Sequence, residues 1–191
     1  MSTPPDKHSP TFQSPRRRLA WAALGLAATG TAAWAWHRFS DGQFSRFSGG
    51  PSRLPDLTYT LIDGRRIGAA ELRDRVVLVN FWATTCAVCV AEMPELVRLH
   101  NDYQPRGLEL LAVAMPYDRP DRVLHFSASR RLPFPVALDP MGQTVAAWGG
   151  VEATPLTWLA GRDGRIRQRL LGRPDFVRLR ADIKTLLAQA G

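Results

Sequence analysis

Apolar and polar positions follow two different periods along residues 53–191, which predicts a domain built from both strands and helices. Residues 76–82 and 108–115 are near-continuous apolar runs with β-branched side chains, as expected for strands buried on both faces. Between them, residues 87–103 carry a helical apolar stripe that Pro94 should kink. A strand, a helix and a second strand in this order predict a right-handed βαβ unit.

Shorter segments extend the predicted sheet on both sides of this unit. Residues 57–62 and 66–67 flank an Asp-Gly turn and predict a small hairpin at the edge of the sheet. Residues 156–160 and 166–171 flank the sequence RDGR and predict a second hairpin. Because a hairpin is antiparallel while the βαβ unit is parallel, the sheet is expected to be mixed.

Two more helices are predicted, one on each side of the second hairpin. Residues 120–131 form the first, and the last follows Pro174, a residue well suited to the first turn of a helix. The apolar stripe of this last helix consists of Phe176, Leu179, Ile183 and Leu187. The pattern as a whole predicts an α/β domain in which helices flank a mixed central sheet.

The N-terminal segment differs in character from the rest of the chain. Residues 19–36 carry no charged side chain, and an arginine cluster directly precedes them. Such a segment is near the lower length limit for a transmembrane helix, and the positive charge before it predicts a cytoplasmic N-terminus. We therefore expect a cytoplasmic basic tail at 1–18, a transmembrane anchor at 19–36, a flexible linker at 37–52 and an exported domain at 53–191.

A cleaved signal peptide is the alternative for the same segment. Ala33 and Ala35 flank Trp34 in a small-x-small pattern, and the arginines resemble a weak twin-arginine export signal. Trp34 and Trp36 suit a membrane interface, which favours the retained anchor. Both interpretations export the domain, so we expect a single-pass protein of the cytoplasmic (inner) membrane whose C-terminal domain faces the periplasm.

The chain is strongly basic, with a formal net charge of +8 at pH 7 and an isoelectric point near 10.6. Its arginines are spread along the whole sequence rather than gathered in one run. An exported domain meets no nucleic acid, so we expect no nucleic-acid partner. A solvated basic surface facing anionic lipid or acidic proteins explains the charge.

Cys86 and Cys89 are the only cysteines and stand at the junction of an apolar strand and a helix. The free N–H groups and the positive end of the helix dipole at a helix start stabilise a thiolate. Only the thiolate attacks a disulfide, and a neighbouring thiol then resolves the mixed disulfide. The pattern predicts a redox-active pair with Cys86 as the nucleophile and Cys89 as the resolving cysteine.

Other uses of this cysteine pair are less well supported. A structural disulfide across so short a loop removes little entropy from the unfolded chain. A structural zinc site needs four ligands, and the four histidines are scattered along the sequence, so we expect no metal. The sequence leaves open a solvent-facing dithiol that binds copper. A peroxiredoxin is disfavoured because its TxxC pattern would need threonine at Ala83 or at Cys86.

The run VVLVNFWATTCAVCVAEMPEL, followed later by VEATPLTWL, resembles the TlpA/ResA branch of membrane-anchored thiol-disulfide oxidoreductases in the thioredoxin superfamily. The resemblance spans residues 53–191 and implies a thioredoxin-like fold with no cofactor besides the Cys86–Cys89 disulfide. It also implies that Thr154 and Pro155 form the cis-proline loop, which lies against the dithiol and presents backbone to a bound substrate.

The resemblance further implies a role for Glu92, which matches the acid that related proteins use near the cysteine pair. Glu92 lies three residues after Cys89, so a partly desolvated carboxyl there could accept the proton of Cys89. An exposed glutamate at a helix start is the alternative. Glu95 is expected to be the solvated one, and Asn80 stands where thioredoxin itself has a buried aspartate.

Two departures from the family pattern concern partner choice and redox potential. Thr85 replaces the tryptophan that usually precedes the first cysteine, so an aromatic surface beside the sulfur is lost. The dipeptide between the cysteines is Ala87-Val88 instead of the more common Gly-Pro or Glu-Pro, and no histidine stands there to favour a strong oxidant. This favours a reductase over an oxidase.

We therefore expect an exported thiol-disulfide oxidoreductase that reduces disulfides of partner proteins, with apocytochrome c or copper-site cysteines as targets. A membrane electron donor of the DsbD/CcdA type, implied by the resemblance, would restore the dithiol. The alternatives are an oxidase that donates disulfides and a non-enzymatic redox sensor or copper-handling module.

Overall fold

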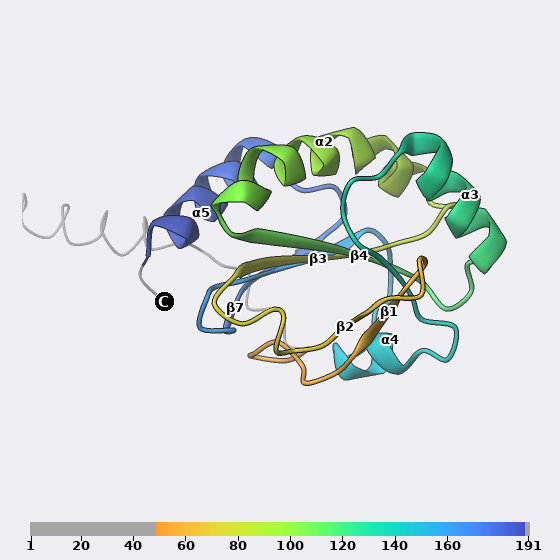
Figure 1. The fold of residues 1–191 in the computed structure, drawn as a ribbon, viewed down its shortest axis with the longest axis horizontal. Helices are drawn as coiled ribbons and strands as arrows, with labels where there is room; N and C mark the ends of the chain where they lie inside the picture. The colour runs from red at the N-terminus through yellow and green to blue at the C-terminus, as the bar shows by residue number, and fades with distance from the viewer. Residues whose placement is uncertain (1–48, 190–191) are drawn as a thin grey trace, which may run out of the picture. The chain divides into compact units, whose positions relative to one another are not determined.

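The structure, a computed structural model, describes residues 49–189, which form a seven-stranded sheet with helices on both of its faces (Figure 1). The strands are β1 (Tyr59–Leu61), β2 (Arg66–Ile67), β3 (Val76–Trp82), β4 (Leu108–Ala114), β5 (Val136–Leu138), β6 (Leu156–Ala160) and β7 (Ile166–Leu171). The helices are α2 (Ala87–Tyr103), α3 (Pro120–Arg130), α4 (Gln143–Ala147) and α5 (Phe176–Ala188), with a 3₁₀ turn at Gln104–Arg106. The strand order is β2-β1-β5-β4-β3-β6-β7, so the sequence-distant β5 and β6 enclose the β4–β3 pair.

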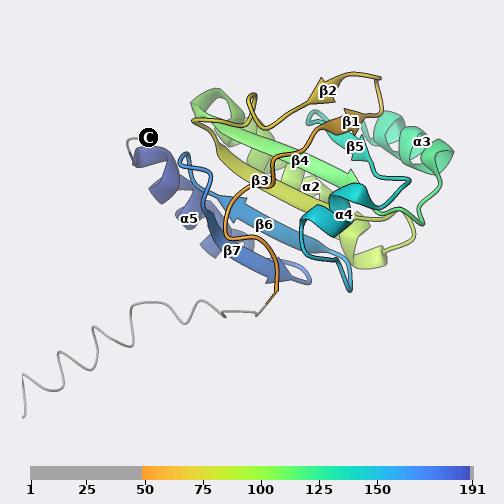
Figure 2. The same ribbon diagram turned by 90° about the horizontal axis from the view of Figure 1, so that it is seen from below.

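Strand β3 lies inside the sheet and ends at the cysteine pair. It pairs in parallel with β4 and antiparallel with β6, so that Val79 stands opposite Leu111 on one side and Trp158 on the other. All seven of its residues are buried. This confirms the prediction of a strand buried on both faces. The burial arises because α2 and α5 cover one face of the sheet and α4 lies across the other (Figure 2).

The side chains of β3 alternate between two hydrophobic clusters. Val76, Leu78 and Trp82 face the cluster that contains Leu96 of α2 and Ile183 of α5. Val77, Val79 and Phe81 face the opposite cluster, where Tyr59, Trp148 and Trp158 pack. The Trp148 indole donates a hydrogen bond to the Tyr59 hydroxyl at 3.0 Å, which satisfies a polar group inside this second cluster.

The pattern-based elements agree closely with the structure, and the mixed α/β architecture is confirmed. Strands 76–82, 156–160 and 166–171 have the predicted bounds, and β1 and β2 form a hairpin at the sheet edge. Helix α2 also has the predicted bounds and continues as one helix through Pro94.

Two elements were not predicted. Strand β5 has only three residues and α4 only five, too few for either periodicity to become visible in a sequence. Both depend on neighbours: β5 fills the gap between β1 and β4, and α4 starts where the Asp139 carboxylate accepts bonds from the Thr144 and Val145 amides.

The predicted tail at 1–18, the predicted anchor at 19–36 and residues 37–48 of the predicted linker lie outside the described residues. Within residues 49–189, no helix is both long enough and apolar enough to cross a membrane.

Candidate active site

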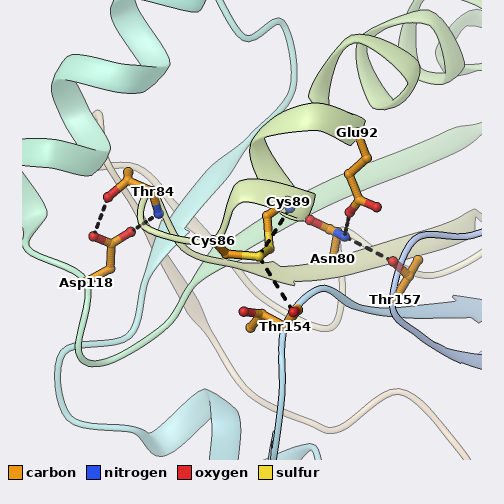
Figure 3. Close-up of a disulfide and its surroundings, with 8 residues drawn as sticks. All are labelled: Asn80, Thr84, Cys86, Cys89, Glu92, Asp118, Thr154 and Thr157. Atoms are coloured by element: carbon orange, nitrogen blue, oxygen red, sulfur yellow. Dashed lines mark hydrogen bonds between the residues drawn. A yellow bond between two sulfur atoms is a disulfide. The ribbon is translucent and has the colours of Figure 1, made fainter.

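Cys86 and Cys89 form a disulfide at the start of α2, directly after β3 (Figure 3). Cys86 is the N-cap residue, with an extended backbone at φ −87° and ψ 104°, and its sulfur accepts a bond from the Cys89 amide at 3.2 Å. The predicted placement at a helix start is observed: the Cys89 amide of the first turn donates to the Cys86 sulfur, and the helix start would stabilise a negative charge on that sulfur.

The two sulfurs differ in access. Cys89 is completely buried, whereas Cys86 is partly exposed. A partner disulfide can therefore reach Cys86 alone, as the assignment of Cys86 as nucleophile requires.

The loop before β6 lies against the disulfide from below (Figure 3). The Thr154–Pro155 peptide bond is cis, Pro155 is buried, and the Thr154 carbonyl oxygen lies 3.6 Å from the Cys86 sulfur. When Cys86 is reduced, its thiol can donate to this oxygen. The structure thus brings Thr154 and Pro155 to the cysteine pair, 68 residues away from Cys86 in the chain.

Glu92 is completely buried one turn beyond Cys89 on α2, so the alternative of an exposed glutamate is excluded. Its Oε1 accepts a bond from the Asn80 side-chain amide at 2.9 Å, and the same amide nitrogen donates to the Thr157 hydroxyl at 3.0 Å. Neither the second carboxyl oxygen of Glu92 nor the amide oxygen of Asn80 has a hydrogen-bond partner. One half of the carboxyl is therefore satisfied and the other half remains available for a proton.

Burial raises the pKa of Glu92 from 4.5 to about 7, while the hydrogen bond from Asn80 and the charge of Arg173 oppose this rise. Burial acts in this direction because the ionised carboxylate loses hydration that the apolar surroundings do not replace. A group with a pKa about 7 exchanges its proton readily near neutral pH, which suits a proton acceptor.

Glu95 provides the comparison on the same helix. It is partly exposed and accepts hydrogen bonds from Arg98 at 2.5 Å and from Arg180 at 3.5 Å. The hydrogen bond from Arg98 lowers its pKa below the ordinary value. Glu95 is thus ion-paired at the surface, and its pKa is lowered where that of Glu92 is raised.

Sequence reasoning missed a second hydrogen-bonded group beside the disulfide. Asp118 is nearly buried, and its carboxylate accepts bonds from the Thr84 amide at 2.5 Å and the Thr84 hydroxyl at 2.7 Å. Figure 3 shows this pair on one side of the disulfide and the Asn80–Glu92–Thr157 group on the other. The available signal was topological, because Thr84 and Asp118 follow the parallel strands β3 and β4, whose carboxyl ends share one edge of the sheet.

The Cys86–Cys89 disulfide can itself carry two-electron chemistry. Across residues 49–189 the structure holds no group of three or more His, Cys, Asp or Glu side chains suited to a metal ion. The redox-active group is the disulfide itself, which takes up two electrons and two protons when it becomes a dithiol.

Comparisons with known proteins agree with this geometry. Residues 52–169 match the model of the AhpC/TSA family. The chain is 31% identical over 133 residues to the thiol-disulfide oxidoreductase ResA of Bacillus thuringiensis (strain Al Hakam), covering 69% of this chain and 75% of that protein. It is 32% identical over 121 residues to the ResA protein of Geobacillus thermodenitrificans (strain NG80-2), covering 63% of this chain and 68% of that protein.

Solved structures of related proteins share this fold. A protein described as a thioredoxin from Neisseria meningitidis superimposes with a TM-score of 0.68 at 32% identity, covering 73% of this chain and 93% of that one. A protein described as a thiol:disulfide interchange protein DsbE from Chlorobium tepidum gives 0.66 at 27% identity, covering 74% and 99%. On this site, fold and sequence similarity, the chain belongs to the AhpC/TSA family and is a thiol-disulfide oxidoreductase with a thioredoxin-like fold.

Proposed function

We propose that the protein is an exported, membrane-anchored reductase that transfers two electrons from the Cys86–Cys89 dithiol to disulfides of partner proteins. The observation that carries this proposal is the division of the site into an accessible sulfur and a buried proton-accepting side. Cys86 is partly exposed, whereas Cys89 and Glu92 are completely buried.

The reaction begins when the Cys86 thiolate attacks one sulfur of the partner disulfide. The S–S bond of the partner breaks, its other sulfur leaves as a thiolate, and a mixed disulfide joins Cys86 to the partner. Cys89 then loses its proton to the free carboxylate oxygen of Glu92 and attacks the Cys86 sulfur. The partner leaves with both cysteines reduced, and the protein keeps the Cys86–Cys89 disulfide.

Repeated turnover requires a source of electrons outside the domain. We propose a membrane protein of the DsbD/CcdA type as the donor, and apocytochrome c or copper-site cysteines as the targets. The apolar segment at residues 19–36 supports this arrangement, because an anchored domain would meet both its donor and exported targets at the inner membrane.

Trapping tests the proposal directly. Cys89→Ala removes the resolving thiol, so partners should accumulate as mixed disulfides with Cys86 that a reducing agent releases. The double variant Cys86→Ala, Cys89→Ala is the matched control and should trap nothing. If Cys86 reacts with an alkylating reagent yet Cys89→Ala traps no partner, the proposed reductase is wrong.

The direction of electron flow follows from the reduction potential, measured by equilibrating the protein with defined thiol buffers. A value near that of thioredoxin, roughly −270 mV, supports a reductase. A value near that of DsbA, about −120 mV, would make the protein a disulfide donor instead. Stoichiometric copper binding by the dithiol without disulfide reduction would identify a copper-handling module.

A further inference from the structure

Two exposed apolar side chains stand on loops at the end of the sheet that carries the disulfide. Tyr117 is 64% exposed and Met141 is 80% exposed. Tyr117 follows β4 and Met141 follows β5, and these strands run parallel to each other and to β3. The carboxyl ends of parallel strands meet at one edge of a sheet, so both loops lie at the edge where β3 leads into Cys86.

Both side chains occupy corners of tight turns. In the turn of residues 115–118 the last amide donates to the first carbonyl at 2.9 Å, and the same bond closes the turn of residues 139–142 at 3.0 Å. Tyr117 and Met141 are each the third residue of their turn. Each exposed side chain is therefore carried by a hydrogen-bonded backbone turn.

A nearly buried aspartate holds each turn in place. Asp118 accepts two bonds from Thr84, which stands two residues before Cys86. Asp139 accepts bonds from the amides of Thr144 and Val145 at the start of α4, at 3.0 and 2.8 Å. The first of these contacts links the Tyr117 turn to the loop that carries the nucleophile, so its position relative to the sulfur is preorganised.

The two turns lie close to each other. If Gly142 carried a Cβ atom, that atom would lie 3.7 Å from Cγ of Pro116. Tyr117 and Met141 are the immediate neighbours of these two residues. We call this pair of side chains the Tyr117–Met141 platform.

We propose that the Tyr117–Met141 platform binds an aliphatic or aromatic side chain that flanks the target disulfide of the partner protein. The inference rests on the proposed reductase function, because a partner disulfide must approach this edge to reach Cys86. Thr85 supplies no aromatic surface beside the sulfur, whereas the platform offers an aromatic ring and an adaptable thioether nearby. Neither side chain is charged, so the surface favours an apolar flank over a charged one.

Two synthetic peptides test the platform. Both carry the same intramolecular disulfide, which is flanked by leucine and phenylalanine in one and by serine in the other. The reduced full-length protein should reduce the apolar-flanked peptide about tenfold faster, the factor expected from burial of one apolar side-chain contact. Hydroxyethyl disulfide, which has no flanking residues, reports the intrinsic reactivity of Cys86.

The double variant Tyr117→Ser, Met141→Ser should lose the preference between the peptides and keep the wild-type rate with hydroxyethyl disulfide. Leu124→Ser is the matched control: Leu124 is 43% exposed on α3, outside the two turns, and its loss should leave the preference intact.

The outcomes separate the platform from the function on which it rests. If the wild-type protein reduces both peptides equally, or the double variant keeps the preference, the platform is wrong while the reductase stands. If the wild-type protein reacts with hydroxyethyl disulfide and reduces neither peptide, the reductase function fails and the platform with it.

Discussion

Glu92→Gln tests whether the buried carboxyl beside Cys89 has the proton affinity that its surroundings impose. Burial raises the pKa of Glu92 from 4.5 to about 7 in the folded, oxidised protein. Between these two values the folded chain binds a proton that the unfolded chain releases. The free energy of unfolding should therefore fall as pH rises through this window, and the contribution of the protonated Glu92 should be fully lost above about pH 7.

The size of the effect follows from the two pKa values. A pKa that rises from 4.5 to about 7 corresponds to a loss of about 3 kcal/mol of stability at pH 8.5, at 1.36 kcal/mol for each pKa unit. Glutamine has the shape of the protonated glutamate and never ionises. Glu92→Gln should therefore match the wild-type stability at pH 4.5 and exceed it by about 3 kcal/mol at pH 8.5.

Urea denaturation of the oxidised protein, followed by tryptophan fluorescence at several pH values, measures this difference. Subtracting the wild-type free energy of unfolding from that of the variant at each pH cancels the pH dependence that the two proteins share. Glu95→Gln is the matched control on the same helix: the pKa of Glu95 is lowered, so neutralising it should bring no gain at high pH. Equal stability of Glu92→Gln and wild type at pH 8.5 would refute the reasoning.

Three further substitutions test other parts of the site and its support. Arg173→Gln removes a charge that lowers the pKa of Glu92, so the pH-dependent loss of stability, measured by the same urea series, should move to higher pH. Asp118→Ala leaves the Thr84 amide and hydroxyl without their acceptor and should cost about 1–3 kcal/mol in urea denaturation at pH 7; an unchanged midpoint would contradict this. Gly149→Ala should lower the free energy of unfolding by about 1–3 kcal/mol in the same assay. The reason is that φ is +81° at Gly149 and the new Cβ atom would lie 2.6 Å from the Cα atom of Gly50.

The candidate site was predictable to the extent that its parts are local in sequence. Cys86, Cys89 and Glu92 lie on one helix, and helical spacing alone places them on neighbouring turns. Thr154 and Pro155 were assigned only through a resemblance in their surrounding residues, because no periodicity joins a loop to a cysteine pair 68 residues earlier. Asp118 carried no local signal and was missed.

The sequence by itself determined the strand and helix periods, the mixed sheet and the position of the dithiol at a helix start. These features depend on which residues repeat along one segment, and β3 and α2 were predicted with the observed bounds. The tertiary structure alone decided that Glu92 is buried, because the surfaces that exclude water from it come from several elements.

The tertiary structure also decided the hydrogen bonds of Asn80. Its partners Glu92 and Thr157 lie 12 and 77 residues away in the sequence. The affinity of the buried carboxyl for a proton is set by desolvation and by these partners, and both exist only after the strands have assembled.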